Sequence, residues 1–267
     1  MSRVRTRFTL SVSCIVASVG LVSLAIGPEA QASGPASAPT SHETTTYGSG
    51  NTKLSMTVTP TRLDVAPSAV GIPQQVDVIN GGKDPLPVTL QKENFIGAAN
   101  GTMAFEATAP YAASDWVTVS PTTFVVAPGA AQVVTATIVV PPKPEPGDHE
   151  VAFIFFVPAG RTRDNIKVNR GIAIPVYITV PGPTTNTSTL SDFHAPGFIT
   201  GGSVALSANV RNSGTVHRTF SGATQMKTEG SGGATFPDFT IMRDSTRDIS
   251  TTWKAPLICY CDPSLSI

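Results

Sequence analysis

The sequence is poor in cysteine and in charged residues. Only 3 of its 267 residues are Cys, and Cys14 lies in the N-terminal apolar segment, which leaves Cys259 and Cys261 in the rest of the chain. Two cysteines cannot supply a disulfide scaffold. Charged residues make up 13% of the chain, with 18 basic and 18 acidic side chains. This balance argues against nucleic acid as a partner and against a polybasic patch for anionic lipids.

The sequence also lacks the motifs of catalytic and metal sites. Its four His residues stand apart, and Cys259-Tyr260-Cys261 is one residue short of C-x-x-C, with no second pair; two free thiols or a small disulfide-like loop is the favoured interpretation. No G-x-S-x-G elbow and no Gly-rich phosphate loop occurs. Asp148-His149-Glu150 is interpreted as a solvated cluster at the entry of a strand. We therefore predict no enzyme activity, no metal and no cofactor.

Long apolar runs are missing beyond the N-terminus. Three arginines within the first seven residues precede the apolar run 8–26, and Ala30-Gln31-Ala32 supplies a small-x-small cleavage pattern. We predict a signal peptide at residues 1–32 and a mature N-terminus at Ser33; the alternative is a retained membrane anchor. The mature chain then has 15 basic and 17 acidic residues, a net charge of about −2. It contains no second run near ~18 apolar residues, so we expect a secreted or cell-surface protein without a membrane span.

What the sequence does contain is typical of β structure. Residues 33–52 have almost no apolar side chains and are predicted to be a disordered Ser/Thr/Pro linker. Residues 53–182 contain seven or eight short segments of alternating apolar side chains, separated by turn residues, which is the pattern of an immunoglobulin-like β-sandwich. The alternation changes parity at Pro60, and there we expect a kink or a bulge.

The second half of the chain repeats the first. Asn212-Ser213-Gly214 mirrors Asn80-Gly81-Gly82, and Phe124–Ile138 aligns without gaps on Phe239–Trp253. Residues 183–267 are therefore predicted to form a second, truncated sandwich that lacks the last two strands of the first. We expect this second sandwich to be loosely packed or to depend on a strand from another molecule. The predicted fold class is all-β, with two immunoglobulin-like β-sandwich modules in tandem, the second incomplete.

Two strands carry candidate partner-binding residues. The segment HEVAFIFFV is apolar on both parities, so Ile154 and Phe156 need a cover. Either a partner supplies that cover or a loop such as residues 93–115 does. Pro175 interrupts the segment GIAIPVYITV and marks it as an edge strand, on which Pro175 and Tyr177 are candidates for pairing with another chain.

Four segments together resemble a known family: VTPTRLDVAP, VDVINGG, WVTVSPTTFVVAPGAAQVVTATIVVP and GIAIPVYITV. They resemble the WxL-interacting surface proteins of Gram-positive bacteria and, more distantly, the first domain of periplasmic pilus chaperones. The resemblance covers residues 53–182 and, more loosely, 188–256. In the chaperones an arginine on the first strand anchors the C-terminal carboxylate of the client, a role that the resemblance gives to Arg62. The second anchor of the chaperones, a lysine, has no match here.

The main functional hypothesis is a secreted bacterial cell-envelope protein whose binding modules contact a protein or a cell-wall component, without catalysis. The first alternative is an assembly or secretion chaperone that pairs an edge strand with a client. The second alternative is a hydrolase with an unrecognised site.

Overall fold

The computed structural model describes residues 54–158, 170–196, 201–221, 225–227, 233–255 and 264–266. The predicted signal peptide and linker lie outside these residues, as do Cys259 and Cys261. All of these residues belong to one unit of the chain, within residues 43–267, and all contacts given below lie within it. The described residues form strands and two short 3-10 helices, η1 (Pro67–Ala69) and η2 (Ser114–Trp116).

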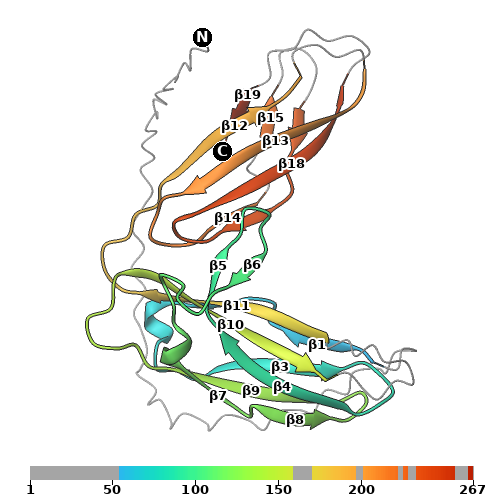
Figure 1. Ribbon diagram of the computed structural model, residues 1–267, viewed down its shortest axis with the longest axis vertical. Helices are drawn as coiled ribbons and strands as arrows, with labels where there is room; N and C mark the ends of the chain where they lie inside the picture. Colours follow the sequence, from blue (N-terminus) through green and yellow to red (C-terminus); the bar gives the residue numbers. More distant parts are fainter. Residues whose placement is uncertain are drawn as a thin grey trace, which may run out of the picture. The chain divides into compact units, whose positions relative to one another are not determined.

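The first part of this unit contains two large sheets, whose strands follow the alternating segments of the sequence (Figure 1). One sheet contains, in spatial order, β1 (Met56–Thr59), β3 (Gln74–Asn80), β9 (Ala131–Ile138) and β7 (Val117–Ser120). The other contains β2 (Leu63–Val65), β11 (Arg170–Val180), β10 (Gly147–Val157), β4 (Leu86–Glu93) and β8 (Thr123–Val126). Their inner side chains form one apolar core, as in a sandwich; Val76, Phe153 and Ile178 are fully buried in it.

The parity change at Pro60 marks a change of sheet. Before it, β1 pairs antiparallel with β3; after it, β2 pairs parallel with β11. Val58 on β1 and Leu63 and Val65 on β2 are all buried in the same core. Because the chain passes from one sheet to the facing one, its buried side chains must switch parity. The irregularity predicted at Pro60 is thus confirmed, and its cause is the crossing between sheets.

The second part of the unit is again built only from strands. One sheet contains, in spatial order, β12 (Ser188–His194), β13 (Gly202–Asn212) and β18 (Ser245–Ala255). A second sheet pairs β14 (Arg218–Phe220) with β17 (Phe239–Ile241). A third contains β16 (Gly233–Thr235), β15 (Gln225–Lys227) and β19 (Ser264–Ser266). They surround a second core, in which Leu206, Ile241 and Trp253 are buried. The all-β, immunoglobulin-like class predicted from the alternation is confirmed.

The internal repeat is reproduced in hydrogen bonds. Asn80 and Asn212 end β3 and β13, and both are fully buried. Each side-chain amide donates to a carbonyl four residues later, at 2.9 and 2.8 Å. Each side-chain amide also donates to a second backbone carbonyl, that of Val126 for Asn80, at 2.9 Å, and that of Ile241 for Asn212, at 3.4 Å. Val126 and Ile241 occupy the same position in the alignment of the two halves. Each Oδ1 accepts a backbone N–H two residues later, at 2.9 Å. The two asparagines satisfy the same turn in the two halves.

Strand β10 is buried on both faces. Its outward side chains lie in a small apolar cluster with the hairpin formed by β5 (Phe95–Gly97) and β6 (Met103–Phe105) and with the turn between β17 and β18. Ile154 is only 7% exposed and Phe156 is half-buried there. Ile154 therefore does not lie on an exposed face. The hairpin within residues 93–115 covers it, which is the second of the two alternatives that the sequence allowed.

The cover over Ile154 leads to a stability prediction. Ile154→Ala should lower the free energy of unfolding by about 2 to 3 kcal/mol, because it leaves a cavity against Phe95 and Met242. Urea denaturation measures the loss. The control Val125→Ala changes a side chain that is 65% exposed and should stay within about 0.5 kcal/mol of wild type. An equally small effect of Ile154→Ala would contradict the packing described here.

Candidate functional site

A cluster of buried polar side chains lies at the start of β10. Asp148 is fully buried, and His149, Glu150 and Arg243 are 7%, 4% and 5% exposed. Arg243 belongs to the turn between β17 and β18. The interpretation of Asp148-His149-Glu150 as a solvated cluster is wrong, because Tyr111, Thr215, His217 and Arg243 pack against the three residues. Burial of several ionisable groups is costly unless each finds a partner.

Asp148 is the best-satisfied member of the cluster. Its Oδ2 accepts the backbone N–H of His217 at 2.6 Å and lies 2.6 Å from Nδ1 of the same residue. Its Oδ1 accepts the hydroxyl of Thr179 at 2.7 Å. Burial acts to raise the pKa of Asp148, but the hydrogen bonds from His217 and Thr179 outweigh it and hold the pKa below the ordinary value.

Arg243 is partnered on three sides. Its guanidinium donates to the backbone carbonyl of Asp148 at 3.0 Å and to Oε1 of Glu145 at 2.8 Å. The same guanidinium lies 3.6 Å above the ring centroid of Tyr111, in a cation–π contact. Its Nε has no hydrogen-bond partner among the described residues. The positive charge of Arg243 is therefore largely compensated by groups of the protein itself.

Glu150 is the least satisfied member. Its Oε1 is buried and has no hydrogen-bond partner within the described parts of the chain. Burial, together with the nearby charge of Asp148, raises the pKa of Glu150 to about 8. The charge of Arg243 and a hydrogen bond from its backbone act in the opposite direction without cancelling this shift. At neutral pH the carboxyl group of Glu150 is therefore mostly protonated.

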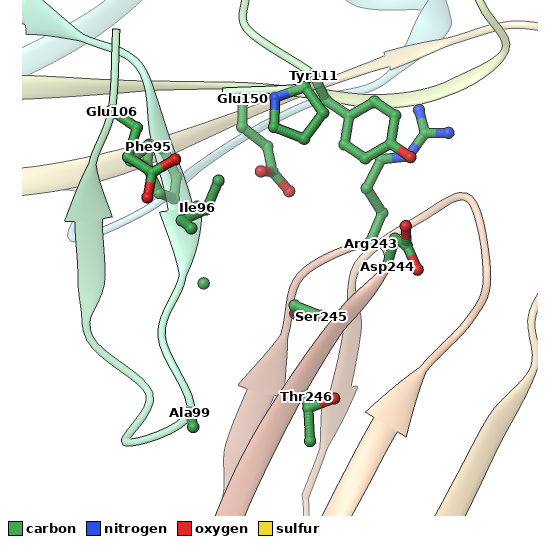
Figure 2. A pocket seen from close by; sticks show the side chains of 12 residues that line it. Phe95, Ile96, Ala99, Glu106, Tyr111, Glu150, Arg243, Asp244, Ser245 and Thr246 are labelled. Atoms are coloured by element: carbon green, nitrogen blue, oxygen red, sulfur yellow. The ribbon is translucent and has the colours of Figure 1, made fainter. Parts of the chain in front are cut away.

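A pocket of about 420 Å³ opens beside Glu150. Figure 2 shows Phe95, Ile96 and Glu106 of the β5–β6 hairpin on one side and the β17–β18 turn on the other. The carboxyl group of Glu150 points into the space between them. The backbone N–H of Asp248 donates to the carbonyl of Ala99 at 2.7 Å and connects the two walls.

The edge of the five-stranded sheet is a second candidate site. β11 pairs with β10 along its full length, Arg170–Val180. On its other side β2 covers only Val176–Ile178. Among the described residues, the segment 170–175 therefore has no strand on this side. Pro175 lies at the boundary between the open and the covered segment, which agrees with the preference of proline for edges.

The remaining candidates have partners inside the protein. Tyr177 is 2% exposed and stacks on His217 with ring centroids 4.4 Å apart. Arg62 forms an ion pair with Asp64 at 2.8 Å and donates to the hydroxyl oxygens of Thr219 and Thr240 at 3.2 and 3.3 Å. Tyr177 thus presents no surface in this state, whereas the side chain of Arg62 is 35% exposed.

Two absences concern the described residues alone. These parts of the chain contain no group of three His, Cys, Asp or Glu side chains that could hold a metal ion. Nor do they contain a helix with the length and apolar character needed to cross a membrane.

No protein-family model matches the sequence, and no curated protein matches it. Solved structures similar to the chain include the YadV chaperone, with 12% identity over 75% of this chain and 84% of that one, at a TM-score of 0.46. The chaperone DraB of E. coli has 13% identity over 73% and 86% of the two chains, with a TM-score of 0.43. The Salmonella enterica SafA pilin in complex with the SafB chaperone has 9% identity over 82% and 99%, with a TM-score of 0.45.

These findings correct the main functional hypothesis. Eight of the matching structures are named as chaperones or as complexes that contain one. The interpretation as a cell-envelope module that binds the cell wall is therefore corrected, because none of these eight structures is named as such a module. The resemblance to WxL-interacting proteins finds no support, while the distant similarity to pilus chaperones does.

Proposed function

We propose that the chain is an exported assembly chaperone that pairs the open edge of β11 with a strand of a client protein. The observation that carries this proposal is the segment 170–175 of β11, which has β10 on one side and no strand on the other among the described residues. An unpaired row of backbone donors and acceptors is a template for strand addition.

The side chains along this edge support the proposal. Ile174 is 1% exposed, and Ile172 is partly buried at the margin of the main core. A client strand added beside them would place its own alternating side chains at this margin and remove apolar surface from water. Backbone pairing would provide affinity, and the alternating side chains would provide selectivity. Arg62, part of whose side chain is exposed, is the proposed contact for a polar group of the client.

A charge at the open edge should block this pairing. In the full chain, Ile172→Lys should weaken binding of a fluorescein-labelled (Val-Thr)₄ peptide at least tenfold, because inward-pointing charge opposes strand addition. Fluorescence anisotropy gives the affinity, and thermal melting checks that the variant is folded.

The matched control is Val125→Lys on β8, at the opposite edge of the same sheet, where the side chain is 65% exposed. It adds the same charge and should leave the affinity within twofold of wild type. Peptide binding should also slow hydrogen exchange at the backbone amides of Gly171 and Ala173, which face the open side because those of Ile172 and Ile174 point to β10. Equal binding by both variants, or protection located elsewhere, would refute edge pairing at β11.

A further inference from the structure

The pocket beside Glu150 has the features of a binding site that edge pairing does not use. Its volume is about 420 Å³, within the range of small-ligand pockets. The side chain of Glu150 is 4% exposed, points into the pocket, and has an acceptor, Oε1, without a partner. A buried acceptor with no partner costs free energy, and an entering donor would remove that cost. We propose that this pocket binds a primary alkylammonium group, whose N–H groups donate to the carboxylate of Glu150.

The charges around the pocket favour a cation. Three carboxylates line it, those of Glu106, Glu150 and Asp244, against a single guanidinium, that of Arg243. Arg243 is paired with Glu145, which does not line the pocket. Asp244 is paired with Arg211. No ion pair is formed by Glu106 or Glu150 in the described part of the chain, so Glu106 and, once it is ionised, Glu150 remain to attract a positive charge.

The apolar walls favour a cation on a hydrocarbon stem. Phe95 is 1% exposed, and Ile96, Pro110 and Tyr111 complete this side of the pocket. A methylene chain lying against these side chains would lose contact with water while its terminal ammonium group reaches Glu150. A lysine side chain of a polypeptide and a free alkylamine share this chemistry.

Binding should depend on pH, because the acceptor must be ionised. The charged and titratable groups that act on Glu150 are Asp148, Arg243 and Tyr177, and Glu106 and Asp244 share its pocket. With a pKa of about 8, the ionised fraction of Glu150 increases about tenfold from pH 6 to pH 7, while an alkylammonium stays charged. The affinity should rise by about the same factor.

The test is a titration of the full chain with n-butylammonium chloride at pH 6, 7 and 8, followed by NMR shifts of the amides of Ile96, Tyr111 and Ser245. Butan-1-ol and sodium butyrate serve as neutral and anionic probes with the same stem. We expect butylammonium to bind at least tenfold more tightly than either at pH 8. Tighter binding of butyrate, equal binding of butanol, or no binding at any pH would overturn the proposal.

Glu150→Gln keeps the shape of the side chain and removes its charge. It should weaken butylammonium binding at pH 8 about tenfold and abolish the dependence on pH. The control Glu93→Gln, at an exposed position on β4 outside the pocket, should change the affinity less than threefold. An unchanged affinity of Glu150→Gln for butylammonium would show that the ammonium group does not bind at Glu150.

A further arm distinguishes the two sources of the ammonium group. The peptide acetyl-Gly-Lys-Gly-amide and its Nε-acetylated form are titrated in the same way. Binding of the lysine form alone identifies a polypeptide side chain as a ligand, whereas binding of butylammonium without the peptide identifies a free amine. None of the residues that line the pocket belongs to β11, where the (Val-Thr)₄ peptide is proposed to bind. Failure of one proposal therefore leaves the other unaffected.

Discussion

Glu150→Gln is expected to stabilise the protein at pH 8 by about 4 to 5 kcal/mol and to have little effect near pH 4. The folded state holds the pKa of Glu150 at about 8, against an ordinary value of 4.5. The folded chain therefore binds a proton that the unfolded chain has lost, and wild-type stability must fall as pH rises from about 4.5 to 8. Each unit of difference corresponds to about 1.4 kcal/mol. Gln is neutral throughout this range and avoids the cost.

Urea denaturation of both proteins at intervals from pH 4 to 9 measures the difference. Glu93→Gln, at an exposed position on β4, controls for the loss of one carboxyl group and should follow the wild-type curve. A constant offset between Glu150→Gln and wild type at all pH values would show that Glu150 does not titrate as described.

Asp148→Ala is expected to destabilise the protein by about 3 to 5 kcal/mol at pH 7. The substitution removes the carboxylate that accepts the backbone N–H of His217 and the hydroxyl of Thr179. Those donors would remain partly buried without an acceptor, which costs more than the bonds themselves contributed. Asp148→Asn keeps one acceptor oxygen and should lose less.

Chemical denaturation of Asp148→Ala, with the exposed Asp115→Ala as the control, measures this loss. The pKa of Asp148 is lowered in the folded state, so the stability that its charge provides is present above the ordinary Asp value and is lost as pH falls below it. The gap between wild type and Asp148→Ala should therefore narrow in acid. A loss below 1 kcal/mol at pH 7 would mean that water replaces the carboxylate.

Much of the fold was predictable because its signals are local. Alternating side chains predicted strands such as β4 and β13, whose buried residues recur at every second position. The parity switch at Pro60 predicted the irregularity between β1 and β2. The match of Asn80 with Asn212 predicted two equivalent turns, since the same polar side chain after the same strand can satisfy the same backbone groups.

The two candidate sites differ in how far the sequence could reveal them. Pro175 predicted that β11 is an edge strand, because a missing N–H is a property of one residue. Among the described residues this holds only for the segment 170–175, since β2 pairs with Val176–Ile178. The ionisable cluster had no such mark. Asp148 and Arg243 are 95 residues apart in the sequence, and Asp148 and His217 are 69 apart. A signal that could have indicated burial is the position of Asp148-His149-Glu150 directly before a segment that is apolar on both parities.

By itself, the sequence determined the all-β class, the strand periodicity and the internal repeat, because period-two patterns and turn residues act over a few neighbouring positions. Only the tertiary structure decided which side chains are covered by segments that are distant in the sequence. The β5–β6 hairpin and Met242 cover Ile154, and the turn that carries Arg243 encloses Glu150. Burial of a carboxyl group, and with it the pKa and the free acceptor of Glu150, depends on segments that meet only after the chain has folded.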